Sequence, residues 1–271
     1  MNKQDLAWEK VQLARNPKRP TSLVLIKDLF PDFLELHGDR LFSDDASIVG
    51  GIATFNGEPI TVIGEEKGDT TANKIKRNFG MPNPEGYRKA KRLILQAEKF
   101  KRPIFLIVDT PGAYPGLGAE ERGQAGAIAT NISLLMEVKT PVVVIILGEG
   151  GSGGALAIGV GDYVMMFENS IFSILSPEGF ASIVFKDSTK AKEAATLMRL
   201  TALDLKDLQA IDEIIPEGEG LHLNKDFGFK HLQIRLTTVL NRLKNLSSSE
   251  LINQRYQKYR QMGVYLEGNH E

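Results

Sequence analysis

The sequence predicts an α/β fold in which helices cover a sheet of parallel strands. Three segments, 103–108, 141–147 and 163–167, are apolar runs without the polar alternation of a half-exposed strand. Helical patterns at 84–100 and 119–138 precede the first two of these segments. Strands and helices that alternate in this order are typical of βαβ units, so we expect a parallel sheet with helices on its faces.

Composition limits what the protein can be. A chain of 271 residues can bury the core of one large domain. Its formal net charge of −1 gives no general attraction for nucleic acid. It has no cysteine, which excludes disulfides, thiolate-bound zinc and a cysteine nucleophile. The first ten residues lack the apolar core of a signal peptide, so we expect a soluble, cytoplasmic protein.

The first 65 residues contain two helical patterns and a hairpin. Apolar spacing predicts helices over 4–14 and 22–30. Strands at 48–55 and 60–65 flank the Asn-Gly pair at 56–57, which is typical of a type I′ hairpin turn.

The next segments are a loop and a helix. Residues 67–84 have no clean period and mix basic residues with glycine and asparagine, which predicts a long ordered loop. This loop is either a solvated charge cluster or an anion site. The helix over 84–100 follows, with one apolar face formed by Tyr87, Ala90, Ile94 and Ala97.

The part of the chain from Lys190 onward is predicted to be mostly helical. A last helix begins at 249–250. An apolar stripe on the helix before it consists of Leu232, Leu236, Leu240 and Leu243. We find no repeat, low-complexity tract or interdomain linker, so we expect a single domain.

The most informative segment is the strand at 141–147 with the residues after it. The strand is followed by a cluster of glycines, at Gly148, Gly150, Gly151, Gly153 and Gly154. Glycines at a strand-to-helix turn let a ligand approach backbone N–H groups. The first N–H groups of a helix lack internal partners and carry the positive end of its dipole. This pattern predicts a site for an anion, or for an oxygen that becomes negative during a reaction.

Three other interpretations of the same segment are open. Residues 141–160 have the length of a membrane span, although Glu149 and the glycines interrupt it and no positive flank follows. The glycines can also serve close packing alone. Finally, residues 150–154 match G-x-S-x-G, the nucleophile elbow of serine hydrolases, with Ser152 as the nucleophile. In that case the least unsuitable base is His222, with Asp212 or Asp226.

A second loop with exposed backbone is expected at 109–116. It reads Asp-Thr-Pro-Gly-Ala-Tyr-Pro-Gly and directly follows the strand at 103–108. Its prolines stiffen the loop, while its glycines leave the backbone accessible. Ligands gather at the carboxyl ends of parallel strands, so this loop should face the one that follows Leu147. Together the two loops would supply N–H donors to one cavity.

Neither loop carries a histidine or a pair of carboxylates in a catalytic spacing. The histidines lie elsewhere, at His37, His222, His231 and His270. This lack of side-chain bases suits a reaction in which backbone dipoles stabilise a developing enolate and the substrates supply their own base. One such donor contributes about 3 kcal/mol to the transition state.

Eight motifs between residues 35 and 179 give the chain its resemblance to a known family. They are Glu35-Leu-His-Gly-Asp-Arg40, Val49-Gly-Gly-Ile52, Arg77-Asn-Phe-Gly-Met81, Pro84-Glu-Gly-Tyr-Arg-Lys89, Asp109-Thr-Pro-Gly-Ala-Tyr-Pro-Gly116, Glu120-Glu-Arg-Gly-Gln124, Gly148-Glu-Gly-Gly-Ser-Gly-Gly-Ala155 and Ser176-Pro-Glu-Gly179. With these motifs in this order, the chain resembles the α subunits of bacterial acetyl-coenzyme A carboxylase carboxyltransferase. It departs from the family at the front, where many members carry a longer helical extension.

The resemblance implies a crotonase-like (ClpP/crotonase) spiral of ββα units with flanking N- and C-terminal helices. In these terms, 1–271 is one carboxyltransferase domain, with N-terminal helices in 1–45, the crotonase-like core in 46–190 and a mostly helical part in 191–271. It also implies transfer of a carboxyl group from carboxybiotin to acetyl-CoA. The product is malonyl-CoA, in the first committed step of fatty acid synthesis.

The resemblance further implies cofactors and partners. Biotin is carried on a separate biotin carboxyl carrier protein, and a biotin carboxylase uses the ATP, in agreement with the lack of a G-x-x-x-x-G-K-[ST] motif here. A β subunit carries the zinc ribbon and the CoA side, so no metal is expected on this chain. An α₂β₂ assembly is expected, with no nucleic acid and no membrane as partner.

The resemblance also assigns site residues. The backbone amides of Gly153 and Gly154 would hold the ureido oxygen of biotin, and Gly112 and Ala113 would form the facing wall and supply a further donor. The biotin nitrogen would take the proton from the acetyl methyl group, so that no side-chain base is needed. Residues expected around the biotin and its anionic groups are Tyr114, Gly150, Gly151, Ser152, Arg122, Lys67 and Arg77.

Three alternatives remain beside this assignment. One is the serine hydrolase that uses Ser152. Another is a carboxyltransferase or decarboxylase subunit for a different acyl-CoA, because acyl choice would lie mainly on the CoA-binding subunit. The third is a scaffold subunit whose glycine-rich loops only pack.

Overall fold

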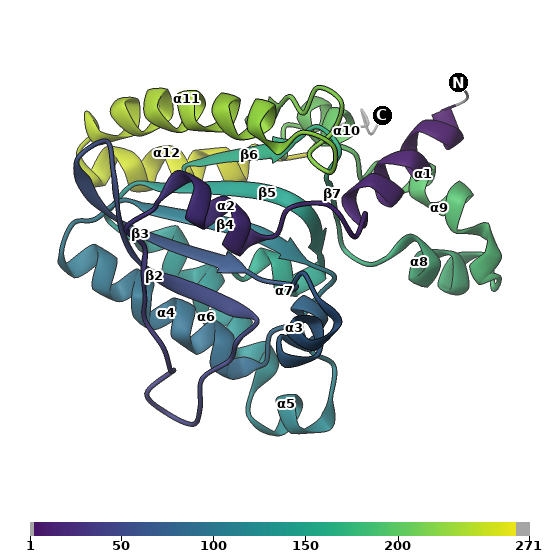
Figure 1. Ribbon diagram of the computed structural model, residues 1–271, viewed down its shortest axis with the longest axis horizontal. Helices are drawn as coiled ribbons and strands as arrows, with labels where there is room; N and C mark the ends of the chain where they lie inside the picture. Colours follow the sequence, from purple (N-terminus) through teal and green to yellow (C-terminus); the bar gives the residue numbers. More distant parts are fainter. Residues whose placement is uncertain (1–2, 264–271) are drawn as a thin grey trace, which may run out of the picture.

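The computed structural model describes residues 3–263, and a mixed sheet of eight strands lies at the centre of this part of the chain (Figure 1). Across the sheet the strands follow the order β1-β2-β3-β4-β5-β6-β8, and β7 pairs with the end of β5. The strands are β1 (Leu34–Glu35), β2 (Ile48–Phe55), β3 (Glu58–Glu65), β4 (Ile104–Thr110), β5 (Val142–Gly151), β6 (Tyr163–Phe167), β7 (Ile171–Ser173) and β8 (Glu213–Ile215).

The pairing of the strands confirms the predicted α/β fold. Strands β3, β4, β5, β6 and β8 are parallel to one another. The predicted hairpin is present, since β2 pairs antiparallel with β3. Asn56 and Gly57 connect these two strands with φ angles of 51° and 81°, the left-handed values that a type I′ turn requires.

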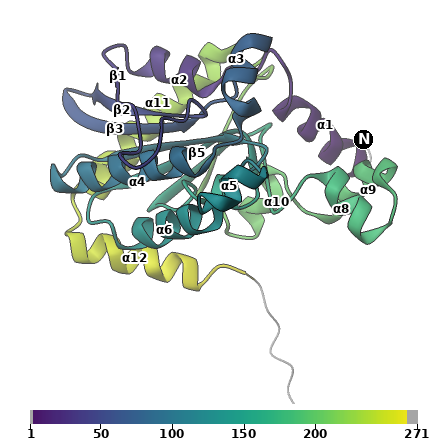
Figure 2. The ribbon, with the colours of Figure 1, turned by 90° about the horizontal axis from the view of Figure 1, so that it is seen from below.

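Helices cover both faces of this sheet (Figures 1 and 2). Helices α2 and α11 pack on one face, and α4 and α6 pack on the other. The helices are α1 (Lys3–Ala14), α2 (Ser22–Leu29), α3 (Thr71–Lys76), α4 (Pro84–Lys99), α5 (Leu117–Glu121), α6 (Gln124–Glu137), α7 (Ser152–Leu156), α8 (Pro177–Val184), α9 (Ala191–Leu197), α10 (Ala202–Asp207), α11 (Lys225–Lys244) and α12 (Ser248–Arg260), with 3₁₀ turns η1 (Asn78–Gly80) and η2 (Ser188–Lys190). The helices predicted at 4–14, 22–30 and 84–100 and the last helix are therefore confirmed.

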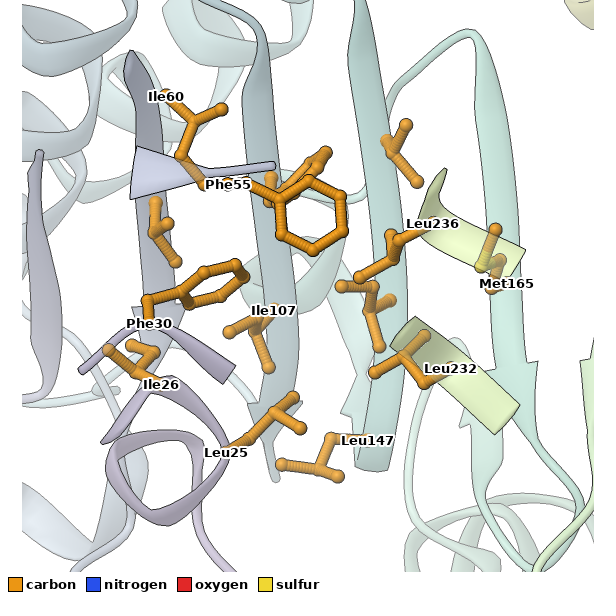
Figure 3. Packing of buried hydrophobic residues seen from close by; sticks show 14 of the residues in the cluster. Leu25, Ile26, Phe30, Phe55, Ile60, Ile107, Leu147, Met165, Leu232 and Leu236 are labelled. Carbon is orange, nitrogen blue, oxygen red and sulfur yellow. The ribbon is translucent and has the colours of Figure 1, made fainter. Parts of the chain in front are cut away.

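The central strands are apolar throughout because both of their faces are covered. Along β5, Val143, Ile145 and Leu147 face the cluster formed with α2 and α11 (Figure 3), while the residues between them face α4 and α6. The predicted leucine stripe of α11 is buried in the first of these clusters, as Leu232 and Leu236 show in Figure 3. Leu147, the last apolar residue before the glycines, is thus fixed by packing.

Helices α1, α8 and α9 lie apart from the layered body, at the right of Figure 1. Helices α1 and α9 share a small core with β7, formed by Ala7, Val11, Ala14, Ile171, Ala195 and Leu200, and α8 packs against α9. The N-terminal helix α1 therefore packs on α9, which comes from the predicted C-terminal range, while α2 packs on the sheet. The division into 1–45, 46–190 and 191–271 stays a prediction.

Two predicted elements, the loop at 67–84 and the helix at 119–138, differ from the structure. The segment 67–84 is not a plain loop, since it contains α3 and η1. Helix α3 buries none of its side chains, so it leaves no apolar period in the sequence; Thr70 caps it by accepting a hydrogen bond from the amide of Asn73. The helix predicted over 119–138 is split into α5 and α6 at Gly123, whose φ of 83° ends the first helix.

The strand before the glycine cluster is longer than predicted. β5 extends from Val142 to Gly151, so Gly148, Gly150 and Gly151 lie in the strand. They are held there by pairing with the end of β4 on one side and with β7 on the other. The strand β8, which the sequence did not predict, has only three residues and adds to the edge of the sheet.

Candidate functional site

The two glycine-containing loops lie against each other at the carboxyl ends of β4 and β5, as predicted. A Cβ atom on Gly151 would lie 2.2 Å from the carbonyl oxygen of Pro111. A Cβ atom on Gly154 would lie 2.4 Å from the amide nitrogen of Ala113 and 2.7 Å from the carbonyl carbon of Gly112. Any side chain at 151 or 154 would therefore push the loops apart, because both contacts are with backbone atoms.

The chain leaves β5 through a strained residue. Ser152, directly after the strand, has a φ of 57°, a left-handed value that costs a non-glycine residue about 1–2 kcal/mol. Helix α7 begins there and has only five residues. The amides of Gly153 and Gly154 lie in its first turn, where N–H groups have no partner within the helix. A helix this short has only a small macrodipole. Negative charge on a ligand would therefore be stabilised by the individual amides and not by the dipole that the sequence predicted.

The facing loop offers one amide rather than two. The Gly112 amide is occupied, since it donates to Thr110 Oγ1 at 3.0 Å. The Thr110 hydroxyl also contacts the carbonyl oxygens of Gly112 at 2.8 Å and of Gly80 at 2.6 Å. Within residues 3–263, no acceptor contacts the amide of Ala113. Gly112 has a φ of 146°, which suits glycine, so its part is to turn the chain and Ala113 is the free donor.

Some of the glycines serve close packing, as one of the alternative interpretations of this segment predicted. A Cβ on Gly150 would lie 2.4 Å from the ring of Phe172 on β7, and one on Gly148 would lie 2.4 Å from Asp109 Oδ1. By contrast, a Cβ on Gly153 would find only ordinary contacts with Ile128, at 3.7 Å and beyond. The packing interpretation therefore explains Gly148 and Gly150, while Gly154 brings two backbones together.

Tyr114 lies at the outer edge of the loop. Its ring covers Gly116, and the side chain keeps 37% of its surface exposed. Its carbonyl oxygen accepts a hydrogen bond from Gln124 Nε2 at 2.9 Å. The loop is thus fastened to α6, and the ring is accessible from solvent.

A chain of ion pairs lies directly beneath the loops. Lys67 Nζ contacts Asp109 Oδ1 at 2.8 Å and Glu149 Oε2 at 2.7 Å. Arg15 Nε contacts Glu149 Oε1 at 2.7 Å, and its Nη1 contacts Glu178 on α8 at 2.8 Å. Burial would raise the pKa of Glu149, but Lys67 and Arg15 outweigh it and lower this pKa. The network joins the segments that directly follow α1 and β3 to β4, β5 and α8.

The three predicted cations are all engaged within the protein. Lys67 belongs to the network just described. Arg122 Nε contacts Glu85 Oε1 at 2.6 Å and stacks on Phe42. Arg77 donates to the carbonyl oxygen of Ala46. The ligand contacts expected for these cations stay predictions, and the structure gives each of them a protein partner.

Two buried polar groups near the loops lack partners. The hydroxyl of Tyr87 is fully buried and lies 3.0 Å from the position of a Cβ on Gly154, and no polar atom of residues 3–263 bonds to it. Glu65, at the end of β3, accepts from the Asp109 amide through one oxygen, while its other oxygen is unpaired. Burial raises the pKa of Glu65 well above the usual range.

Sequence reasoning missed the network and these two groups. Their partners lie far apart along the chain, 82 residues in the case of Lys67 and Glu149, and no local spacing reveals them. The available signal was weak: Asp109 ends an otherwise apolar strand, and Glu149 is the one charge among the glycines.

The hydrolase alternative finds no base in the structure. No histidine in residues 3–263 hydrogen-bonds to Ser152. His37 pairs with Asp44, and His231 contacts the carbonyl oxygen of Phe227. His222 lies beside Gly220, and its buried Nδ1 has no partner in this range; His270 lies outside the described residues. Ser152 therefore lacks the general base that an elbow serine needs.

The membrane alternative is also unsupported. In the described range, no helix is long and apolar enough to cross a bilayer. Residues 141–160 instead form the whole of β5, the short α7 and the turn after it.

Comparison with known proteins gives matches along nearly the whole chain. The family described as acetyl co-enzyme A carboxylase carboxyltransferase-like matches residues 3–263. The acetyl-coenzyme A carboxylase carboxyl transferase subunit alpha of Bacillus thuringiensis (strain Al Hakam) is 56% identical over 257 residues, which is 94% of this chain and 79% of that protein. The protein of the same name from Bacillus anthracis (strain CDC 684 / NRRL 3495) has the same identity and coverage.

Solved structures with little sequence identity share the fold. The β subunit of geranyl-CoA carboxylase from P. aeruginosa aligns with a TM-score of 0.66 at 16% identity, covering 96% of this chain and 48% of that one. Transcarboxylase 12S aligns with a TM-score of 0.63 at 15% identity, and the alignment covers 91% of this chain and 43% of that one. A chain of the Pseudomonas malonate decarboxylase MdcD–MdcE heterodimer aligns with a TM-score of 0.65 at 16% identity. This alignment covers 80% of this chain and 89% of that one. The chain spans less than half the length of the geranyl-CoA carboxylase and transcarboxylase chains. The similarity of these structures confirms the predicted crotonase-like fold.

Proposed function

Because the chain belongs to the acetyl-coenzyme A carboxylase carboxyltransferase family, we propose that its Ala113, Gly153 and Gly154 amides hold the ureido oxygen of biotin during carboxyl transfer. The chain is a biotin-dependent carboxyltransferase of the α-subunit type. It transfers a carboxyl group from carboxybiotin to acetyl-CoA and forms malonyl-CoA, the first committed step of fatty acid synthesis.

The observation that carries the proposal is the contact between Gly154 and Ala113. It brings an amide without an acceptor next to the first turn of α7, at the carboxyl ends of two parallel strands. Such donors fit a ureido ring, which is neutral but has an oxygen that gains negative charge when the ring loses a substituent. Bound carboxybiotin supplies the carboxyl group that is transferred.

The other residues keep this arrangement in place. Thr110 holds the peptide between Gly112 and Ala113 by its carbonyl oxygen, which fixes the direction of the Ala113 amide. Lys67 and Arg15 neutralise Asp109 and Glu149 beneath the loops, so that no unpaired carboxylate repels an incoming carboxyl group. We propose that Tyr114, which is half-exposed at the outer edge of the loop, packs against the biotin ring. Gly150 and Gly151 shape the floor, with Ser152 as the turn.

The site on this chain is incomplete by itself. The cavity beside Gly150 and Gly151 has a volume of about 30 Å³, whereas pockets for small molecules usually enclose about 300–1,000 Å³. Large apolar side chains are exposed on the loop and helices around it, namely Leu117, Leu156, Ile174, Ile183 and Val184. Both observations support a partner that completes the site.

We accordingly propose a β subunit with a zinc ribbon as the partner that binds CoA, in an α₂β₂ assembly. The carboxylated biotin arrives on a biotin carboxyl carrier protein, and the ATP is used by a separate biotin carboxylase. Zinc is assigned to the β subunit and not to this chain. We propose that the complex works in the cytoplasm and requires neither nucleic acid nor a membrane.

The test is the reverse reaction, decarboxylation of malonyl-CoA that depends on a soluble biotin derivative. We expect activity only when the chain is co-expressed with a zinc-ribbon β subunit. Activity of the chain alone, or none in a well-assembled complex, would contradict the proposal. In the second case other acyl-CoAs are tested next, and labelling by a serine-directed phosphonate examines Ser152.

A variant separates the amide site from a scaffold role. Gly154→Ala pushes a methyl group to within 2.4 Å of the Ala113 nitrogen, and we expect a loss in kcat of about 100-fold or more with assembly intact. Gly126→Ala is the control, because a Cβ at this position of α6 meets nothing within 4 Å. Equal turnover of the two complexes would favour the scaffold interpretation.

A further inference from the structure

A second cavity lies at the opposite end of the strands that carry the glycine site. It has a volume of about 500 Å³ and opens at the amino ends of β3, β4 and β5, beside Pro59, Pro103 and Pro141. Its other walls are the turn after α4, the turn after α6 and the connection between α11 and α12, at the left of Figure 1. Its size falls within the range of pockets that bind small molecules.

The floor of this cavity contains a buried positive charge without a carboxylate. Arg102 is only 8% exposed. Its guanidinium donates to Thr61 Oγ1 and to Gln96 Oε1, both at 3.1 Å, and both of these acceptors are neutral. No acidic side chain in residues 3–263 lies within ion-pair distance of it, and burial lowers its pKa. A buried charge of this kind costs stability unless a counter-charge is bound.

Two further cations lie at the rim of the cavity. Lys101 and Lys139 are exposed, and neither ammonium group forms an ion pair within the described range. The acidic residues of the cavity do not compensate them. Glu58 pairs with Lys244, and Glu98 accepts a hydrogen bond from the backbone amide of Lys139 at 3.0 Å. The cavity thus has a surplus of positive charge.

The facing wall of the cavity contains an apolar patch. The α11–α12 connection contributes Leu243, Leu246 and Leu251 to it, beside Lys244 and Ser248. On the cation side Phe100 is 58% exposed, and the guanidinium of Arg102 lies over its ring at 5.2 Å from the centroid. A ligand that fits both walls carries a compact anionic group at one end and an apolar or aromatic group at the other.

We propose that this cavity binds a small organic phosphate, with its phosphate group against Arg102, Lys101 and Lys139 and its organic part against Phe100 and the leucine wall. A phosphate with two negative charges matches a cavity lined by these three cations better than a single carboxylate does, and the planar guanidinium suits its oxygens. The site is independent of the proposed carboxyl transfer, because it lies at the other end of the strands.

The test measures binding to the full chain by titration calorimetry, with phenyl phosphate and inorganic phosphate as probes. We expect saturable binding of both, and tighter binding of phenyl phosphate by about threefold or more because the apolar wall contacts its ring. If neither probe binds at millimolar concentration, the proposal is wrong. Equal affinities would overturn the assignment of the organic part.

Variants locate the binding. Arg102→Met keeps the buried stem without the charge and should weaken phenyl phosphate by about tenfold or more. Lys101→Met combined with Lys139→Met changes only exposed groups, so it tests the same site if the first variant folds poorly, and we expect a loss of about fivefold. Lys230→Met, on the outer surface of α11, removes one positive charge elsewhere and should leave binding unchanged. Unchanged affinity in both cavity variants would overturn the proposal.

Discussion

The two ends of strands β3, β4 and β5 differ in how their charged side chains are paired. At the carboxyl ends, Lys67 and Arg15 are paired with Asp109, Glu149 and Glu178. The donor left without an acceptor in residues 3–263 is the backbone amide of Ala113. At the amino ends, the backbone is satisfied by the sheet. Lys101, Arg102 and Lys139 of the second cavity form no ion pair within residues 3–263, whereas Lys244 pairs with Glu58.

This difference matches two kinds of ligand. An oxygen that is neutral at first and gains charge only during reaction is best served by fixed dipoles, because a full charge would bind the ground state as strongly as the transition state. A ligand that arrives fully charged is best served by full charges. The comparison therefore predicts that ion pairing contributes most to stability at the glycine site. Loss of an ion pair there should lower the free energy of unfolding strongly.

The largest effect should follow from breaking the pairing beneath the glycine loops. Lys67→Met leaves Asp109 without its cation, and we expect the free energy of unfolding to fall by about 3 kcal/mol. Urea unfolding measures it. Lys225→Met is the control, since its pair with Asp28 is exposed and worth less than about 1 kcal/mol. Similar losses of stability in the two variants would mean that the ion pairs at the carboxyl ends stabilise the protein no more than an exposed pair does.

A smaller effect on turnover should come from Thr110, which orients the free amide. Thr110→Val removes its hydrogen bonds to Gly112 and Gly80, and we expect kcat to fall about tenfold, with a smaller change in KM for the biotin derivative. Thr110→Ser keeps the hydroxyl and should restore most of the rate. The decarboxylation assay of the α–β complex measures both.

A control separates this effect from stability. Thr201→Val removes a hydroxyl that caps α10, at a cost to folding of about 1 kcal/mol, comparable to that expected for Thr110→Val. If both variants lose stability and turnover alike, Thr110 has no orienting role.

Much of this arrangement was predictable from the sequence. The apolar runs predicted β4, β5 and β6 because both faces of these strands are buried. The position of both loops directly after parallel strands predicted that they lie together at the carboxyl ends. Local patterns could not give the split at Gly123 or helix α3, since a single backbone angle and an exposed helix leave no apolar period. The site residues outside the loops depend on contacts across the sheet, which no spacing encodes.

The cavity at the amino ends illustrates the same limit. In the sequence, Lys101 and Arg102 are two charged residues between the predicted helix at 84–100 and the predicted strand at 103–108, and no motif singles them out. Only the fold shows that Arg102 is buried, that its acceptors are neutral and that Lys139 joins it from another turn.

The pH dependence of stability sharpens the comparison through one apparent exception, the unpaired Glu65. Its folded pKa is raised by burial, so the folded state keeps a proton that the unfolded chain loses above about pH 4.5. Stability from this group is therefore present below that pH and is lost as the pH rises. Glu65→Gln should remove this loss and gain on the order of 1 kcal/mol at pH 8 relative to pH 5.

Glu217 is the matched case of opposite sign. Burial would raise its pKa, but its contact with Arg19 outweighs burial and lowers it, so its stabilisation is present above about pH 4.5 and is lost as the pH falls. Urea unfolding of Glu65→Gln and of Glu217→Gln between pH 4 and pH 8 gives the two signs. If Glu65→Gln shows no gain at high pH, Glu65 is charged in the folded protein and the carboxyl ends do hold an unpaired charge.

The smallest expected effect concerns the buried hydroxyl of Tyr87, beside Gly154. Because this hydroxyl has no partner in residues 3–263, Tyr87→Phe removes a desolvated polar group and should raise the free energy of unfolding by about 0.5 kcal/mol. Tyr259→Phe should do the reverse, since its hydroxyl accepts a hydrogen bond from the Gly161 amide at 2.9 Å. Urea midpoints of the two variants, measured together, give the comparison. A loss of stability in both would mean that Tyr87 is hydrogen-bonded in solution, and the wall behind the amides would then be as fully paired as the ionic network.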